Sequence, residues 1–445
     1  MSGFISALSV VGSILIMLLI LTVLVVVHEW GHYIAARIFG VKVNEFAIFM
    51  GPKIYSRKGK KTGTVFSVRC LPLGGFCAME GEETTEETDT SFSNKPWWQR
   101  TIILLAGVFM NIVLALVIMT VIFVINGYTT RRVSYVSEYM PVSLIGLEVN
   151  DRIVEYNGYS IYNQLDYNLA TYVDGIGDSE ITIKKENGSK ETYAFSRIVD
   201  ESAKNVNVTV FRIDGKTKTH VGDYTAKWDK GLLDIEMLYD DQSKITYLFS
   251  LQSEESTVFD AVKTSYDASG NQISREEGLF RDEESQSRIR GYSPTQYGYS
   301  FTYKKGNIFE TVGNAFMYNV SLVKSVFSSL KWLITGRIGM DAMSGPIGLT
   351  TVVKDVVTAD TTIGIRIGAL IEMAALISAN LAAFNVLPIP GLDGGKLIFV
   401  VIELIRRGKK VPPEKEAVVS LIFLALLILF SIFVAGNDIL RIIRT

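Results

Sequence analysis

Four long apolar segments constrain this chain more than any other feature of its sequence. A helix needs about 20 predominantly apolar residues to cross the hydrocarbon core of a bilayer. The hydrophobic fraction of 48% and the mean hydropathy of +0.26 over 445 residues indicate that apolar residues are concentrated in such spans. We therefore expect a polytopic α-helical membrane protein with four transmembrane helices, over residues 4–27, 102–125, 367–387 and 417–435.

Two basic loops set the expected orientation of these spans. Lys and Arg residues are frequent between the first and second spans, and they recur in the short connection between the third and fourth. Such residues accumulate in cytoplasmic loops. We expect both loops in the cytoplasm, and both chain ends and residues 126–366 outside. The first span is expected to be a membrane helix, because it lacks the basic start and the small-residue cleavage site of a signal peptide.

The first span ends in a motif with metal-binding spacing, His28-Glu29-Trp30-Gly31-His32. Residues four apart share one face of a helix, so His28 and His32 can direct two imidazoles to one point. H-E-x-x-H is the pattern of zinc-dependent hydrolysis. We predict that both histidines bind one Zn²⁺ and that Glu29 takes a proton from a water at that metal. Because residues 4–27 carry no charge, hydrolysis is expected inside the bilayer.

A second stretch that suits a metal site closes the third span, over residues 385–395. Its prolines and glycines predict that the helix breaks at its cytoplasmic end. Asp393 is an oxygen donor suited to be the third zinc ligand, which leaves a fourth position for water. The expected topology places it on the same side as the histidines. Asn385 is a candidate to hold the substrate backbone or an oxyanion, and Pro388 and Pro390 are candidate substrate-binding residues.

Between the first two spans we expect a β region that is cytoplasmic or re-enters the membrane. Residues 41–49 and 64–69 alternate roughly between apolar and polar, with a turn between them. In the apolar stretch 71–76, Gly74 and Gly75 are candidates to bring the backbone close to a substrate. An acidic run follows and is expected to be a solvated linker: Glu80, Glu82, Glu83, Glu86, Glu87 and Asp89.

Asn111 is a polar residue inside the second apolar span. A buried amide in lipid needs a hydrogen-bond partner on another helix. Two interpretations stay open, packing between helices and a place near the catalytic centre with substrate contact.

The outer segment is expected to begin with a small β-rich domain over residues 127–230. Residues 146–158 combine a Gly-Leu turn, a polar turn, an alternating strand and a closing Asn-Gly. Residues 231–306 are expected to be a further β-rich layer or an insertion. Apolar residues then recur at helical spacing, which predicts an amphipathic interfacial helix and a following turn over residues 307–350.

The expected organisation places each motif in one segment. It comprises the first span with its motif (1–39), the β region and acidic linker (40–100), the second span (101–126), the outer segments described above, the third span with Asp393 (364–395), a basic cytoplasmic loop (396–416), and the fourth span with a tail (417–445).

These stretches together resemble the site-2 protease family of intramembrane zinc metalloproteases. They are most similar to its bacterial RseP/RasP group, the regulators of sigma-E proteolysis, whose members have extracytoplasmic PDZ domains. The similar pieces are residues 28–32, 72–76, 106–111, 344–347 and 385–395, with 403–410 and 436–439 also similar. Residues 146–158 resemble one PDZ domain, and residues 200–300 depart from the family's pattern.

The resemblance implies one Zn²⁺ per chain and regulated cleavage of single-span membrane proteins, such as anti-sigma factors or signal-peptide remnants. Another protease would first remove their outer part. The PDZ-like domain would exclude bulky substrates or bind a peptide or protein, and the hairpin near Gly74 would pair with the unwound substrate strand. The family's place is the bacterial cytoplasmic membrane, with the active site near the cytoplasmic side.

Two other classes of protein are alternatives. One is a catalytically silent membrane scaffold that binds peptides through the PDZ-like domain, although the intact His28, Glu29, His32 and Asp393 argue against it. The other is a zinc-dependent transporter or sensor, which would usually have more histidines than the three in this chain. The net charge of -2 argues against a nucleic-acid partner.

Overall fold

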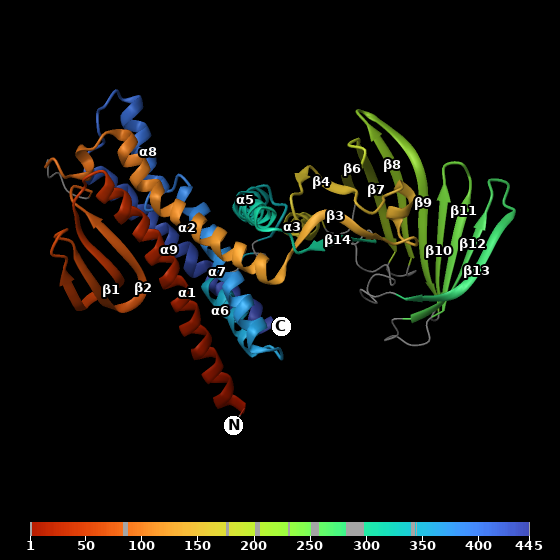
Figure 1. Ribbon diagram of the computed structural model, residues 1–445, viewed down its shortest axis with the longest axis horizontal. Helices are drawn as coiled ribbons and strands as arrows, with labels where there is room; N and C mark the ends of the chain where they lie inside the picture. The colour runs from red at the N-terminus through yellow and green to blue at the C-terminus, as the bar shows by residue number, and fades with distance from the viewer. Residues whose placement is uncertain are drawn as a thin grey trace. The chain divides into compact units, whose positions relative to one another are not determined.

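The structure is a computed structural model, and it divides into two compact units (Figure 1). Unit 1 holds Met1–Asn126 and Ile308–Thr445, and unit 2 holds Gly127–Asn307. The structure describes residues 2–82, 88–174, 178–200, 205–229, 232–250, 258–281, 298–339, 343 and 345–444.

Four helices of unit 1, among the residues described, are long and apolar enough to cross a membrane. The apolar spans are Val10–Ile38, Trp97–Asn126, Ile363–Val386 and Glu414–Leu440. They confirm the number of spans expected from the sequence. They belong to helices α1 (Ser2–Ile38), α2 (Trp97–Asn126), α7 (Ile363–Val386) and α9 (Pro413–Arg444).

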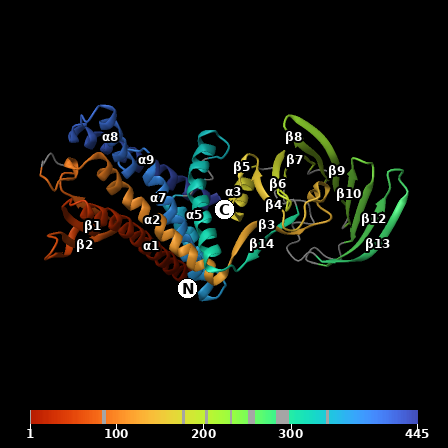
Figure 2. The same cartoon turned by 45° about the horizontal axis from the view of Figure 1, so that its top comes forward.

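Helix α2 packs between α1 and α7 (Figures 1 and 2). The buried face of α7 is made of small residues, including Ala375, Ser378, Ala379 and Ala382, which let two helix backbones approach closely. At this contact the Ser378 hydroxyl donates to the Asn111 carbonyl at 2.9 Å. The close packing fixes the position of α2, which lies beside the metal-binding motif of α1.

The other described helices of unit 1 complete it, and two of them correct the sequence analysis. The turn expected near residue 346 begins a helix, and the expected basic loop 396–416 is helical up to Ile405. The Asp438 carboxylate of α9 explains the first, since it accepts hydrogen bonds from the backbone N–H groups of Gly345 at 2.9 Å and Gly348 at 2.8 Å. These helices are α5 (Ile308–Ile334), α6 (Pro346–Thr358), α8 (Asp393–Ile405) and η1 (Phe92–Asn94).

Strands β1 (Val43–Lys58) and β2 (Val65–Met79) form a folded sheet in unit 1. Each strand bends, so the register pairs Ala47 with both Phe76 and Ser67. Residues 43–48 therefore form a central segment between residues 65–68 on one side and residues 75–79 on the other. No other described strand pairs with residues 75–79, which leaves them at an edge of this sheet.

Unit 2 is built on a sheet of 12 described strands, and the neighbours in it pair antiparallel. The order is β13-β12-β11-β10-β9-β8-β7-β6-β4-β3-β14, with β5 on β4. The strands are β3 (Tyr128–Val136), β4 (Arg152–Tyr156), β5 (Tyr159–Ser160), β6 (Ser179–Lys184), β7 (Lys190–Asp200), β8 (Asn205–Asp214), β9 (Thr217–Asp229), β10 (Leu232–Tyr239), β11 (Lys244–Ser250), β12 (Val258–Tyr266), β13 (Gln272–Arg281) and β14 (Tyr299–Lys304), and the helices are η2 (Pro141–Ile145) and α3 (Gln164–Asp174).

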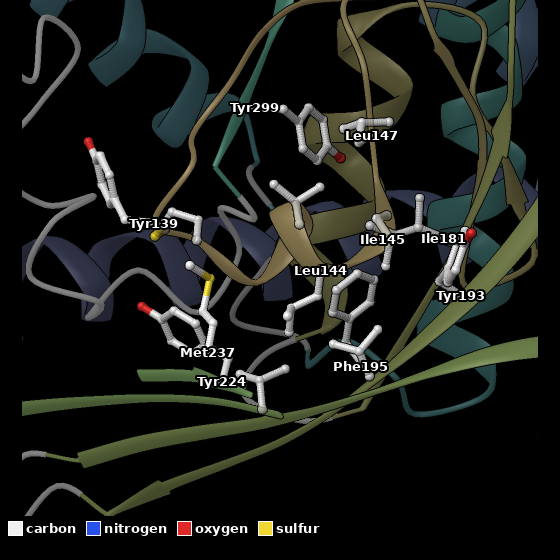
Figure 3. Packing of buried hydrophobic residues seen from close by; sticks show 14 of the residues in the cluster. Tyr139, Leu144, Ile145, Leu147, Ile181, Tyr193, Phe195, Tyr224, Met237 and Tyr299 are labelled. Atoms are coloured by element: carbon white, nitrogen blue, oxygen red, sulfur yellow. The ribbon is translucent and has the colours of Figure 1, made fainter. Parts of the chain in front are cut away.

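One hydrophobic core runs through unit 2. Leu144 of η2 packs in the same buried cluster as Phe195 of β7, Tyr224 of β9 and Met237 of β10 (Figure 3). Strand β9 pairs with β10, for example through Ala226 and Ile235. The strands on the two sides of residue 230, the boundary expected from the sequence, therefore share one sheet and one core, because apolar residues alternate toward one face in both.

Candidate metal centre

His28, His32 and Asp393 bring three potential ligand atoms to one point in unit 1, within 4.8 Å of one another. The Nε2 atom of His28 lies 2.9 Å from Oδ2 of Asp393 and 3.1 Å from Nε2 of His32. The Nε2 atom of His32 lies 3.2 Å from the same carboxylate oxygen. Both histidines are buried. Two imidazoles that share one carboxylate oxygen inside an apolar helix bundle form the donor set that zinc prefers.

The Nδ1 atom of each imidazole, which does not contact Asp393, has its own partner. Nδ1 of His32 donates to the Ile103 carbonyl at 2.8 Å, which leaves a lone pair on Nε2 for a metal. Nδ1 of His28 lies 3.3 Å from the side-chain amide of Asn111. The Asn111 oxygen has no partner in the described structure, and an amide turned by 180° would place it on Nδ1–H of a metal-bound His28. The partners of both Nδ1 atoms are therefore compatible with a metal ion bound at the Nε2 atoms.

Gly107 of α2 gives the two imidazoles their space. A Cβ atom at this position would lie 2.8 Å from Nε2 of His28 and closer still to Nε2 of His32. Any side chain there would displace the ligands. The glycine therefore lets α2 support the imidazoles while its backbone passes next to them.

Asp393 reaches the histidines because α7 ends at Val386 and a short connection leads to α8, whose first residue is Asp393. Gly394 and Gly395 pack directly on the connection, so that a Cβ atom on either would overlap the carbonyl of Leu387 or Ile389. Farther along α8, Glu403 accepts a hydrogen bond from buried Arg100 of α2 at 2.5 Å. The turn and this ion pair together fix the helix that carries the third ligand.

The electrostatic surroundings keep Asp393 ionised. Burial by itself would raise the pKa of its carboxyl, but the imidazoles of His28 and His32 at its Oδ2 atom outweigh burial and hold that pKa well below its usual range. An ionised carboxylate is the form that binds zinc.

A cavity of about 510 Å³ opens beside these ligands. Its walls include Glu29 and His32 of α1, Asp393 and Lys396 of α8, and residues 76–79 of the sheet edge. Glu29 therefore shares a space with two of the ligands, where a water molecule and a peptide can also be held.

The remaining candidate residues lie at different distances from this centre. Asn111 is next to His28, which favours orientation of that ligand over substrate contact. Asn385, Pro388, Pro390, Gly74 and Gly75 are not among the described residues that line the cavity.

The acidic run behaves differently from the solvated linker that we expected. Glu80 pairs with Lys42 and Glu82 pairs with Lys396, while Glu83, Glu86 and Glu87 lie outside the described residues. The structure thus places Glu82 and Lys396 at the wall of the cavity, although the sequence analysis gave neither of them a role there. The available signal was a charged residue at the border of, or inside, an apolar helix.

Comparison with known proteins agrees with this centre. Residues 16–430 match peptidase family M50. The zinc metalloprotease RasP of Shouchella clausii is 26% identical over 441 residues, which cover 96% of this chain and 99% of the relative. The regulator of sigma-W protease RasP of Bacillus subtilis is 25% identical over 514 residues, which cover 97% and 99%. The matches extend through both units, and this chain therefore belongs to peptidase family M50, the site-2 proteases, as a zinc metalloprotease of a bacterial membrane.

Proposed function

We propose that the protein cleaves transmembrane segments of single-span membrane proteins, within the membrane and by peptide-bond hydrolysis. The observation that carries this proposal is one cavity, between apolar helices, that contains Glu29 together with His32 and Asp393. His28, His32 and Asp393 would hold one Zn²⁺. The bound ion would supply a Lewis acid, which polarises the substrate carbonyl and acidifies water.

Glu29 performs the proton transfers of the reaction. Its carboxylate accepts a proton from the water whose oxygen attacks the scissile carbonyl carbon. When the C–N bond breaks, the same carboxyl returns the proton to the leaving nitrogen, so that one water is consumed and two chain ends are formed. Asn111 and the Ile103 carbonyl hold the imidazoles in place throughout, because neither contact involves the Nε2 atoms.

Residues 75–79 supply the substrate platform. A helical substrate hides its carbonyls in internal hydrogen bonds, so the segment must unwind before attack. An unwound segment can add as a strand to this sheet edge, with main-chain hydrogen bonds replacing those of the helix. The edge suits this task because residues 76–79 line the same cavity as Glu29. Gly74 and Gly75 then shape the entry to the edge, and Asn385 holds the emerging chain.

The two ends of the chain and unit 2 are proposed to lie outside the cytoplasm, with the metal centre near the cytoplasmic side. The basic residues between α1 and α2 and those after α8 support this orientation. Within unit 2, residues 127–230 act as a PDZ-like domain that excludes substrates with bulky outer parts. Anti-sigma factors and signal-peptide remnants, shortened by another protease, are the proposed substrates.

The Glu29→Gln variant tests the reaction. It keeps the shape of the side chain and the three ligands but removes the base, so cleavage should fall by about 10²–10⁴-fold while zinc content and melting temperature stay unchanged. Mass spectrometry of membranes from cells that carry the variant should show single-span proteins with shortened outer parts accumulating. Cleavage at the normal rate by Glu29→Gln would contradict the proposal.

A further inference from the structure

Lys396 lines the cavity and has no role in the reaction described above. It is the one lysine or arginine among the described residues that line the cavity. It follows Asp393 by three residues on α8, so the two side chains share one face of that helix. Its side chain is 44% exposed and pairs with the Glu82 carboxylate.

Glu82 links this lysine to the proposed substrate edge. Its second carboxylate oxygen accepts a hydrogen bond from the backbone N–H of Met79 at 3.4 Å, a long and therefore weak bond. The ammonium group has three donors, and the contact with Glu82 uses one of them. The remaining donors can serve a bound substrate.

Burial by itself would lower the pKa of Lys396, but Glu82, Asp393 and Glu29 outweigh burial and raise that pKa well above its usual range. The group is therefore a cation whenever the enzyme is active. A cationic donor forms stronger hydrogen bonds to a carbonyl than a neutral donor does.

The geometry of an added strand gives this donor a target. Carbonyls of an extended chain point alternately to its two sides, so those facing the sheet edge meet backbone N–H groups while the others point away from it, into a cavity that Asp393 and Lys396 of α8 also line. The scissile carbonyl must face the histidines and Asp393. The next carbonyl on the same side is two residues away, about 6.6–6.8 Å along the strand. That spacing is close to the separation of about 5–6 Å between the Cβ atoms of residues three apart on a helix, as Asp393 and Lys396 are.

We propose that Lys396 is a substrate-binding residue that donates a hydrogen bond to the main-chain carbonyl two residues from the scissile bond, with Glu82 holding its ammonium group and releasing the Met79 N–H to the incoming strand. This inference rests on the proposed function and extends it to substrate recognition. The hydrogen bond from Lys396 also meets a physical need, because the carbonyls of an unwound segment in an apolar setting must find donors.

The test is a double-mutant cycle between the enzyme and the substrate backbone. The full-length zinc enzyme in proteoliposomes is given a synthetic single-span apolar peptide whose cleavage site has been mapped by mass spectrometry. Thioamides, in which a weakly accepting sulfur replaces the carbonyl oxygen, are placed two residues before and two residues after that site. Wild-type enzyme, Lys396→Met, Lys396→Arg and the exposed control Lys409→Met are compared.

We expect one of the two thioamides to raise KM about tenfold with wild-type enzyme, Lys396→Arg and Lys409→Met, and to have no further effect with Lys396→Met. Lys396→Met should itself raise KM about tenfold on the normal peptide while zinc content and melting temperature stay at their wild-type values. If Lys396→Met does not fold, the paired change Glu82→Met with Lys396→Met leaves no unpaired charge and serves in its place.

Equal thioamide penalties with and without the lysine would overturn the inference. That result is distinct from failure of the proposed function, which would appear as normal cleavage by Glu29→Gln.

Discussion

The contacts that stabilise the inside of each unit differ in their range along the sequence. In unit 1 the decisive polar contacts join residues that are far apart in sequence: His28 and Asp393 are separated by 365 residues, and Arg100 and Glu403 by 303. In unit 2, strands β6 to β13 follow one another in both sequence and space, so each pairs with its neighbour in the chain. A change in unit 1 should therefore act at a distance, whereas a change in unit 2 should stay local.

The largest expected effect comes from breaking a buried ion pair of unit 1, and an exposed ion pair of unit 2 serves for comparison. Arg100 and Glu403 have side chains only 8% and 13% exposed, so Glu403→Met would leave a buried, unpaired guanidinium and cost about 3–5 kcal/mol of stability. Arg275 and Glu277 lie two residues apart and are 55% and 64% exposed, so Glu277→Met should cost at most about 1 kcal/mol. Denaturation of the purified protein in detergent measures both.

The paired change Arg100→Met with Glu403→Met provides the control for this comparison. It removes both charges, and most of the lost stability should return because no charge stays buried without a partner. Similar losses from Glu403→Met and Glu277→Met would break the proposed contrast between the units.

The second effect concerns a glycine that sets the space between helices. Gly107→Ala adds a Cβ atom that overlaps both imidazoles, so the ligands must move and activity should fall about 100-fold. Zinc bound per chain, measured by elemental analysis, should fall with it. Gly368→Ala in α7 is the matched control, since no atom lies within 4 Å of its added Cβ and alanine favours a helix. Full zinc content in Gly107→Ala would show that the imidazoles do not depend on α2.

The same difference in range explains what the sequence could predict. Span length and the i, i+4 spacing of His28 and His32 are local patterns, and they were sufficient to identify the helices and two of the three candidate ligands. The break before Asp393 was also local, since its prolines and glycines stand together. Alternating residues in 180–185 and 206–213 likewise predict strands, and the structure contains them as β6 and β8.

The partners of charged residues could not be predicted in this way. Glu82 stands in an acidic run that is typical of a solvated linker, and only the folded chain brings Lys396 to it. The sequence did not predict helix α8, because the basic residues that follow it favoured a loop. In unit 2, no local pattern reveals that β10 continues the sheet of β9, because register across a turn depends on which faces share a core (Figure 3).

The smallest effect is a pH dependence of local stability at two turns, one in each unit. A hydrogen bond from Lys42, followed by one from Thr90, holds the pKa of Glu80 at about 2, below its ordinary value of 4.5. A lowered folded-state pKa stabilises the protein above pH 4.5, and this stabilisation is lost as the pH falls from 4.5 toward 2. Hydrogen exchange at residues 43–48 and 88–92, corrected for the intrinsic rate, should therefore quicken over this range in the wild type and stay constant in Glu80→Gln.

Asp267 gives the matched case in unit 2. Backbone N–H groups, above all that of Asn271 at 2.8 Å, lower the pKa of this exposed carboxyl, so its protonation also weakens the fold as the pH falls. Every one of those donors lies within four residues of Asp267, and the loss should be confined to the turn between β12 and β13. Glu80, in contrast, reaches Lys42 across 38 residues, so its protonation should also loosen the strand segment beside the proposed substrate edge. Acid-induced exchange that stays within residues 80–90 would show that long-range contacts in unit 1 do not transmit local changes.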